Sequence, residues 1–258
     1  MRVALTIAGS DPSGGAGIQA DLKTFHQFGV YGEAVITLLT VQNTRCGGRV
    51  EVLPAGLVIE QLQAVLEDIP PAAAKTGALG SGQIVGALAR AVDTFHFPLV
   101  VDPVLTGKRG QVLLDSSAVT ALRDDLLPRA ALITPNVPEA ETLAGLAIRG
   151  PEEMRRAAEI LRGMGARAVL IKGGHLEANR KMLDVLLNGG EWHEFPAPRL
   201  ETRHTHGTGC TYSAAITAYL ARGLSLSHAV RQAKEYITQA IARSQRARGH
   251  SILNHFWR

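Results

Sequence analysis

The stretch Val3-Ala-Leu-Thr-Ile-Ala-Gly-Ser-Asp-Pro-Ser-Gly-Gly-Ala-Gly-Ile-Gln-Ala-Asp-Leu22 holds the unit from which the fold is built. Its beginning, residues 3–8, is almost continuously apolar, as in a strand whose two faces are both buried. A glycine-rich turn follows over residues 9–17, and an amphipathic segment begins near residue 16. A strand that leads through a short turn into a helix is the repeating unit of α/β proteins.

The same unit recurs outward along the chain. Further apolar runs of strand length lie at residues 34–40, 72–75, 99–102, 131–134 and 168–172. Amphipathic segments lie near residues 16–28, 57–68, 81–93, 115–127 and 151–164. This alternation predicts an α/β fold of three layers, with a mostly parallel central sheet flanked by helices.

The last third of the chain departs from this alternation. Residues 182–195 predict a β-hairpin that two adjacent glycines close. Two helices are expected over residues 209–222 and 226–246, with Gly223 as the C-cap of the first. No internal repeat, low-complexity tract or linker is visible, so we expect a single domain over residues 1–258.

The composition favours a globular protein with small anionic ligands. Of the 258 residues, 46% are hydrophobic and 19% are charged, and the formal net charge is +4. The basic residues form no dense stripe, which argues against a nucleic-acid interface and leaves either a solvated basic face or anionic metabolites as partners. Cys46 and Cys210 lie far apart without metal-ligand spacing, which favours a reducing compartment. The N-terminal apolar run is too short for a signal peptide and no stretch could span a membrane, so we expect a cytoplasmic protein.

Stretches rich in glycine and polar residues follow the predicted strands or precede the predicted helices. They are residues 9–17, 39–44, 75–79, 102–110, 134–141, 172–175 and 205–210. Because open α/β sheets bind ligands at the carboxyl ends of their strands, these stretches predict one composite site. The turn at residues 9–17 lacks the Gly-Lys-Ser/Thr ending of a Walker P-loop, and it does not match the dinucleotide fingerprint.

The sharpest local motif is His204-Thr-His-Gly-Thr-Gly-Cys-Thr211, a glycine-rich turn that opens a helix. The first N–H groups of a helix lack internal partners and attract anions, and Gly207 and Gly209 permit a phosphate to approach closely. The same field is expected to lower the pKa of the Cys210 thiol. The alternative is a turn beside a small buried cysteine. His204 and His206 have no acidic partner in any zinc spacing, so a metal site there is disfavoured.

Together these motifs resemble the hydroxymethylpyrimidine/phosphomethylpyrimidine kinases of thiamine biosynthesis, in the ribokinase-like superfamily. The resemblance is carried by residues 7–21, 41–44, 102–104, 134–141, 171–175 and 254–257. Thr208-Gly209-Cys210 is similar to the Gly-x-Gly-Asp motif of ribokinase-like enzymes, with cysteine in place of the aspartate. The resemblance implies a ribokinase-like three-layer fold with a small β-hairpin or flap, and a homodimer.

The resemblance also implies a kinase that uses ATP and Mg²⁺ to phosphorylate 4-amino-5-hydroxymethyl-2-methylpyrimidine and then its monophosphate. Cys210 corresponds to the proton acceptor, beside an anion hole formed by Gly207, Thr208 and Gly209. The residues expected to contact the substrate are Gln42, Asp21, Gly9, Ala16, Ala78 and Val104. Those expected at the nucleotide are Lys172, Thr205, Lys108 and Lys234. Those expected at Mg²⁺ are Asn136 and Glu139.

Several of these residues have a structural alternative when only the sequence is considered. Gln42 offers both a donor and an acceptor, which suits a ring nitrogen beside an amino group but equally a turn. Asp21 occupies the place of a first-turn helix acid. Asn136 and Glu139 have the spacing of a helix cap, and the capping and Mg²⁺ roles can hold at once. Lys108 and Lys234 are also compatible with solvated surface charges.

Two other functions stay open at this point. A pyridoxal kinase of the same fold shares the cysteine, whereas Gln42 together with Asp21 favours an aminopyrimidine. Ala78 stands where related kinases often carry methionine against the ring, which leaves the breadth of the pocket open. A non-catalytic sensor of vitamin precursors would be expected to lack the phosphate-handling residues, yet this chain has Asn136, Glu139, Lys172, Gly209 and Cys210.

Overall fold

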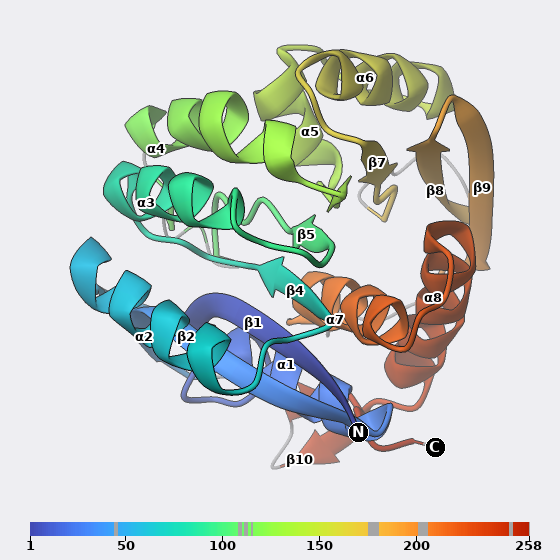
Figure 1. Ribbon diagram of the computed structural model, residues 1–258. Helices are drawn as coiled ribbons and strands as arrows, with labels where there is room; N and C mark the ends of the chain where they lie inside the picture. Colours follow the sequence, from blue (N-terminus) through green and yellow to red (C-terminus); the bar gives the residue numbers. More distant parts are fainter. Residues whose placement is uncertain are drawn as a thin grey trace.

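The computed structural model describes residues 1–43, 46–107, 110, 113–114, 116–174, 181–200, 206–247 and 250–257. Its centre is a nine-stranded sheet with helices on both faces (Figure 1). The strands are β1 (Arg2–Ser10), β2 (Val30–Gln42), β3 (Gly47–Val52), β4 (Ala73–Thr76), β5 (Leu99–Val101), β6 (Leu132–Ile133), β7 (Ala168–Ile171), β8 (Lys181–Asn188) and β9 (Glu191–Pro198). The helices are α1 (Gly17–Gln27), α2 (Ala55–Asp68), α3 (Gly82–Val92), α4 (Ser116–Ala121), α5 (Val137–Ala144), α6 (Pro151–Gly163), α7 (Thr208–Ala221) and α8 (Leu226–Ala242).

The strand order creates a crevice near the middle of the sheet. The order is β3-β2-β1-β4-β5-β6-β7-β8-β9. The six central strands, β2-β1-β4-β5-β6-β7, pair in parallel. β3 at one edge and the β8–β9 hairpin at the other edge pair antiparallel. After β1 the chain turns to one side to form β2 and then returns to the other side to form β4. Such a switch point is where a doubly wound sheet binds its ligands.

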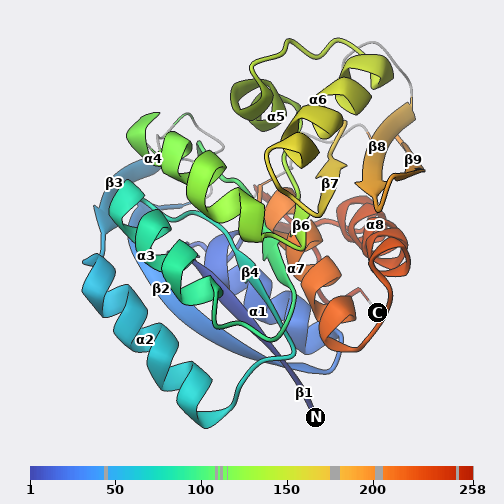
Figure 2. The same cartoon turned by 45° about the horizontal axis from the view of Figure 1, so that its top comes forward.

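Each face of the sheet carries its own hydrophobic core. Because side chains alternate along a strand, Leu5 and Ile7 of β1 belong to one core and Ala4 belongs to the other. The first core includes buried residues of α2 to α6, and the second includes those of α1, α7 and α8. Figures 1 and 2 show the two helical layers on opposite sides of the sheet. α7 is buried around almost its whole surface, as expected for a helix between the sheet and α8.

The predicted parallel strands are all present, with their ends shifted by a few residues. The predicted hairpin is β8–β9, and both Gly189 and Gly190 have positive φ angles, as a tight hairpin turn requires. Gly223 has a φ of +87° directly after α7, which confirms its role at the end of that helix. No helix in the described ranges is long and apolar enough to cross a membrane.

Four segments differ from the prediction, and the first of them is α5, which was not among the predicted helices although a helix cap at Asn136 was considered. The helix expected over residues 115–127 is α4 followed by a π-helical and a 3₁₀ turn, because Pro128 has no N–H to continue the α-helical pattern. The helix expected over residues 226–246 ends at Ala242, and a two-stranded ribbon follows it, formed by β10 (Gln245–Ala247) and β11 (His250–Ile252). β3 was not predicted, since its pairing with β2 depends on contacts that no local pattern contains.

Candidate active site

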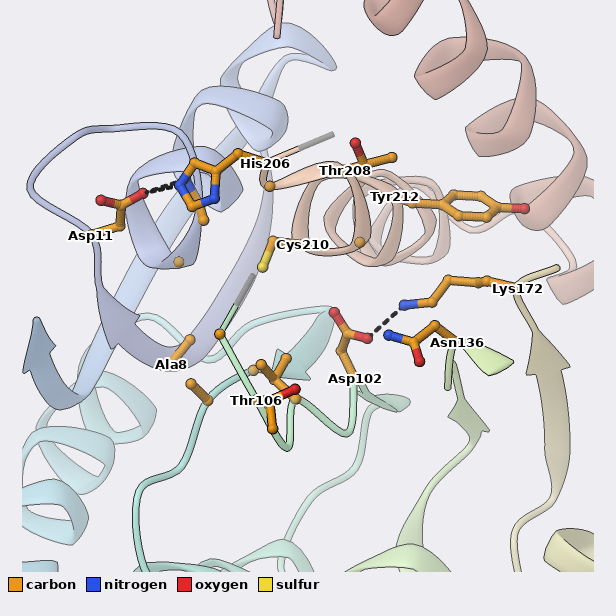
Figure 3. A pocket seen from close by; sticks show the side chains of 18 of the residues that line it. Ala8, Asp11, Asp102, Thr106, Asn136, Lys172, His206, Thr208, Cys210 and Tyr212 are labelled. Carbon is orange, nitrogen blue, oxygen red and sulfur yellow. Dashed lines mark hydrogen bonds and ion pairs between the residues drawn. The ribbon is translucent and has the colours of Figure 1, made fainter. Parts of the chain in front are cut away.

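A cavity of about 520 Å³ opens at the carboxyl ends of the parallel strands, beside the switch between β1 and β4. Each of the seven stretches selected from the sequence contributes at least one described residue to its wall. Seven segments far apart in the sequence therefore surround one site, and Figure 3 shows part of their side chains, among them Asp11, Asp102, Asn136, Lys172 and Cys210.

The N-terminus of α7 forms the middle of the cavity wall. Its N-cap, Gly207, has a φ of +75°, and the Gly207 carbonyl accepts the N–H of Thr211 (2.9 Å). A Cβ atom at Gly207 would collide with the carbonyl oxygen of Gly15, so only glycine fits this turn. The N–H groups of the first helical turn, which contains Thr208 and Gly209, have no acceptor within the helix. Together with the helix dipole they suit an anion.

Cys210 extends from the first turn of α7 towards the cavity (Figure 3). Burial raises the pKa of its thiol to about 11, and this effect outweighs the nearby charge of Lys75, which lowers the pKa. The expectation that the helix terminus lowers this pKa is therefore wrong, because lost solvation disfavours the thiolate more than the local field favours it. Cys210 is a neutral thiol at pH 7.

An ion pair between Lys172 and Asp102 lies on the same part of the wall (Figure 3). The carboxylate of Asp102 accepts hydrogen bonds from Lys172 Nζ (2.9 Å) and from the hydroxyls of Thr134 and Ser213 (3.1 Å each). Burial opposes the charge of Asp102, but Lys172 lowers the pKa of this carboxyl below its usual range. A Cβ atom on Gly209 would lie 3.3 Å from Lys172 Nζ, so a fixed cation faces the first turn of α7.

Asn136 and Glu139 form a capping box at the start of α5. Asn136 Oδ1 accepts the N–H of Glu139 (2.9 Å), and Glu139 Oε2 accepts the N–H of Asn136 (2.8 Å), so the structural alternative for this pair is present. Both residues also line the cavity. Burial raises the pKa of Glu139 to about 7, although Lys172 lowers it.

The described residues contain no cluster of three His, Cys, Asp or Glu side chains that could hold a metal ion. Mg²⁺ usually keeps several waters and takes few protein ligands, since phosphate oxygens supply much of its coordination. Asn136 Oδ1, which can accept a second hydrogen bond, and the other carboxylate oxygen of Glu139 fit such a water-mediated site at the cavity wall.

Lys234 is buried, which removes the alternative of a solvated surface charge. Its Nζ donates to Asp184 Oδ2 (2.6 Å) and lies 5.8 Å from the centre of the Tyr212 ring. The other oxygen of Asp184 accepts the N–H of Gly173 (3.0 Å). Lys234 therefore lines the cavity and is also joined to the loop that follows β7.

Five of the six residues expected at the substrate line the cavity: Gly9, Ala16, Gln42, Ala78 and Val104. The sixth, Asp21, lies elsewhere. It is fully buried, and its Oδ2 accepts hydrogen bonds from Thr6 Oγ1 (2.6 Å) and Lys75 Nζ (2.8 Å). The reason is that α1 turns Asp21 towards β1 and β4, where the side chain of Lys75 occupies the interior. The expectation that Asp21 hydrogen-bonds the substrate directly does not fit this position.

Two residues expected at the nucleotide, Lys108 and Thr205, lie outside the described residues, as do His175 and His204.

The comparisons with known proteins identify the family. A family model described as phosphomethylpyrimidine kinase matches residues 11–254. The chain belongs to the phosphomethylpyrimidine kinase family. It is therefore a phosphotransferase, and the resemblance predicted from the sequence motifs is confirmed.

Curated members of the phosphomethylpyrimidine kinase family match almost the whole chain. The hydroxymethylpyrimidine/phosphomethylpyrimidine kinase of Bacillus subtilis is 44% identical over 98% of this chain and 94% of its own length. The kinase of the same name from Rhizobium meliloti is 46% identical over 99% of this chain and 97% of its own. The thiamine biosynthesis bifunctional protein ThiED of Geobacter sulfurreducens is 48% identical over 97% of this chain, which spans about half (51%) of that protein.

Solved structures confirm the ribokinase-like fold. Phosphomethylpyrimidine kinase from Clostridium difficile aligns with a TM-score of 0.83 and 42% identity, over 93% of this chain and all (100%) of that one. An ADP complex of Bacillus subtilis pyridoxal kinase aligns with a TM-score of 0.90 and 37% identity, over 99% of this chain and 97% of that one. Kinases named for two different vitamin precursors therefore share this architecture.

Sequence reasoning missed several residues of this kinase's site. Asp102 and Lys75 lie in the selected stretches, but neither was assigned a role. A signal for Lys75 was available, since a lysine inside a buried strand needs a counterion. Asp184 and the contact between Asp11 and His206 (2.9 Å) had no such signal, because their partners are distant in the chain.

Proposed function

We propose that this kinase transfers the γ-phosphoryl group of ATP to the hydroxymethyl oxygen of 4-amino-5-hydroxymethyl-2-methylpyrimidine, and then phosphorylates the resulting monophosphate. The observation that carries the proposal is the continuity of the cavity. α7 packs on β1, β4 and β5, so its N-terminus lies between the β1–β2 side of the cavity, which carries Gly9 and Gln42, and the β7–α8 side, which carries Lys172 and Lys234. This arrangement suits an acceptor at one end and a triphosphate at the other. The names of the curated relatives support the same reaction.

The acceptor end suits a small aromatic ring. Gly9, Ala16 and Ala78 leave space between the walls, and Val104 adds an apolar surface. The amide of Gln42 can donate to a ring nitrogen and accept from the neighbouring amino group. Asp21 does not line the cavity but acts indirectly, because its carboxylate binds the buried side chain of Lys75.

The nucleotide end suits ATP. The apolar residues at this end of the cavity are Met182, Leu200, Ile237 and Ile241, and they offer a surface for an adenine ring. The ammonium group of Lys172 faces the α7 terminus, where the transferred phosphoryl group would lie. The hydroxyl of Thr208, buried and without a hydrogen-bond partner within the described part of the chain, is available to a phosphate oxygen. When bound, Mg²⁺ would neutralise charge on the phosphates, with Asn136 and Glu139 orienting its waters.

Phosphoryl transfer depends mainly on positioning and charge stabilisation, which the N–H groups of Gly207 to Cys210 and the Lys172 ammonium supply. In the first step the proton of the hydroxymethyl group passes to the small fraction of Cys210 that is present as the thiolate. In the second step the acceptor is a phosphate, which is mostly an anion at pH 7 and needs no base. An aspartate at position 210 would repel that anion, whereas a neutral thiol does not.

Variants at Cys210 test its two roles. We expect Cys210→Ala to slow the first phosphorylation by about 10²–10⁴-fold, the usual contribution of a general base, and to change the second by much less. Cys210→Asp is expected to retain part of the first activity and to lose most of the second. A Cys210→Asp variant with the full second-step rate would show that the repulsion argument is wrong.

The pH dependence of the first step follows from the raised pKa of Cys210. Because that pKa is about 11, the thiolate fraction rises about tenfold per pH unit below it, and kcat of the first step should rise between pH 6 and 9. The second step should lack this rise, since its acceptor phosphate ionises near pH 6. Rates of both steps over this range, measured for the wild type and for Cys210→Ala, check the assignment.

The decisive assay is mass analysis of the products formed from the pyrimidine alcohol, its monophosphate and pyridoxal, each with ATP and Mg²⁺. We expect mono- and diphosphorylated pyrimidine. Pyridoxal is a second candidate substrate, because the aligned structures include pyridoxal kinases with TM-scores of about 0.90. Tight binding of the pyrimidine without any turnover of ATP would favour a non-catalytic sensor. A homodimer stays a prediction of the family resemblance, and a cytoplasmic location stays a prediction from the sequence.

A further inference from the structure

The glycine-rich turn after β1 is organised around one carboxylate, that of Asp11. Its two oxygens accept hydrogen bonds from Ser13 N (2.8 Å), Ser13 Oγ (2.9 Å) and Ala16 N (2.9 Å). The Asp11 carbonyl also accepts the N–H of Gly14 (2.9 Å). Asp11 is almost fully buried, at 1% exposed. The shape of the turn therefore depends on a charge that solvent barely reaches.

The same carboxylate also binds a side chain from the far end of the chain. Asp11 Oδ2 lies 2.9 Å from Nε2 of His206, the residue directly before the α7 N-cap (Figure 3). Although burial opposes the charge of Asp11, hydrogen bonds from His206 and Ser13 outweigh it and hold the pKa of this carboxyl well below its usual range. Asp11 is therefore an anion that His206 helps to stabilise.

The backbones of the two turns also touch. A Cβ atom on Gly207 would collide with the carbonyl of Gly15, and one on Gly15 would lie 2.8 Å from the His206 ring. The two turns are therefore packed directly against each other, so that a displacement of one is transmitted to the other.

The two turns serve opposite ends of the proposed reaction. Gly9, Ala16 and Gly17 line the acceptor end of the cavity, whereas Gly207 to Cys210 form the anion site. A ligand that orders one turn should therefore lower the cost of ordering the other. Such an effect is reciprocal, since each ligand must raise the affinity of the other by the same factor.

We infer that His206 is a positioning residue that couples the two ends of the cavity: through Asp11 it makes binding of the pyrimidine alcohol and of the nucleotide mutually supportive. This inference rests on the proposed function, because it assumes that both ligands use this cavity. His206 touches neither reacting atom in this assignment. It acts through the shape of the turn at Asp11 and through the placement of Gly207.

The test measures the dissociation constant of the pyrimidine alcohol by calorimetry, without nucleotide and with a saturating non-hydrolysable ATP analogue plus Mg²⁺. The ratio of the two constants is the coupling factor. We expect at least fivefold coupling in the wild-type kinase, the lower end of typical values. His206→Ala should reduce the factor to about one. His206→Gln should restore most of it, because a glutamine amide can donate to Asp11 as the imidazole does.

Two further variants separate coupling from general damage. Asp11→Asn removes the acceptor charge and should also reduce the factor, and combining it with His206→Ala should add little, as expected for two partners of one contact. His193→Gln changes a histidine of β9 whose acidic neighbour is Glu191 (3.8 Å) and which does not line the cavity; its factor should equal that of the wild type. If His206→Ala unfolds, His206→Gln and Asp11→Asn still decide the question.

The outcomes separate the inference from the proposed function. Product analysis of the wild type tests the reaction alone. A wild type that phosphorylates the pyrimidine but shows a coupling factor of one overturns the inference and leaves the reaction intact. A His206→Ala variant that keeps the wild-type factor does the same. If His206→Ala weakens binding of both ligands but keeps the wild-type coupling factor, the role of His206 is merely structural and the inference is wrong.

Discussion

Two lysine–aspartate pairs lie near the carboxyl ends of the parallel strands, yet they serve different purposes. Lys75, within β4, binds Asp21 at 2.8 Å, and both side chains are fully buried (0% exposed). Lys172 after β7 binds Asp102 at a similar 2.9 Å, but its side chain is 13% exposed and lines the cavity. Burial raises the pKa of Asp21, whereas Lys172 lowers that of Asp102 despite burial. We call Lys75–Asp21 the sealed pair, because it lies in the interior behind the site. We call Lys172–Asp102 the open pair, because it is part of the cavity wall.

The comparison teaches that distance alone does not identify a functional ion pair. Both pairs have short distances, and in both the lysine lies within or directly after a buried strand. Access to the cavity separates them, because only an exposed ammonium group can exchange its partner for a phosphate. A charge without that access must be neutralised within the protein, and removing its partner costs several kcal/mol.

The largest effect is expected from breaking the sealed pair. Asp21→Asn keeps the shape of the side chain but leaves Lys75 without a counterion, so the free energy of unfolding should fall by about 3–5 kcal/mol. Chemical denaturation measures this change. The matched control is Asp124→Asn, which breaks an exposed pair with Arg123 and should cost no more than about 1 kcal/mol. Replacing both partners, as in Asp21→Leu with Lys75→Met, should recover part of the lost stability.

The same variant also tests the position of Asp21. If Asp21 acts only through Lys75, the KM for the pyrimidine should change by less than about threefold in the folded Asp21→Asn enzyme. A direct hydrogen bond between a charged group and the substrate would be worth about 1.5–3 kcal/mol, and its loss would raise KM by at least tenfold. Such a rise would restore the role that the sequence motif implied and would contradict the burial of this side chain.

Breaking the open pair should affect turnover instead. Lys172→Met removes a cation aimed at the transferred phosphoryl group, and kcat should fall by about 10²–10³-fold, as for other preorganised charges. Asp102 keeps the hydroxyls of Thr134 and Ser213, so the free energy of unfolding should fall less than in Asp21→Asn. Steady-state kinetics and denaturation of the same preparation test both points. A Lys172→Met enzyme with normal kcat and strongly reduced stability would mean that the two pairs do not differ in kind.

Much of this architecture is visible in the sequence, because each parallel strand is a short apolar run followed by its own polar or glycine-rich stretch. The same pattern located seven segments of the cavity wall, since the carboxyl ends of parallel strands meet at one edge, but it did not locate the parts of the wall that β3, β8 and α8 contribute. The glycine-rich motif before Cys210 also predicted the turn at the start of α7, because such a turn depends on residues that are adjacent in the chain.

What the sequence could not show is the direction of a side chain after the helix has packed. Asp21 belongs to the substrate motif by its place in the chain, but the packing of α1 on β1 and β4 directs it inwards. The prediction of a lowered pKa for Cys210 was wrong for a similar reason. The helix terminus is a local feature, whereas burial of the thiol depends on the whole fold. The contact between Asp11 and His206 spans 195 residues, and no local pattern encodes it.

A third pair, Lys234 with Asp184, is intermediate and allows the comparison to be refined. Its distance is 2.6 Å, its lysine is 10% exposed and lines the cavity, and Asp184 holds the N–H of Gly173. We expect Lys234→Met to raise the KM for ATP by about tenfold, the equivalent of about 1.4 kcal/mol, with a smaller change in kcat than in Lys172→Met. Asp184→Asn should raise the same KM, because the loop after β7 loses an anchor. Lys234→Met could instead lower the free energy of unfolding as much as Asp21→Asn and leave the KM for ATP unchanged. A lysine exposed by about one tenth would then be inaccessible to phosphate, and Lys234–Asp184 would be a buried structural pair like Lys75–Asp21.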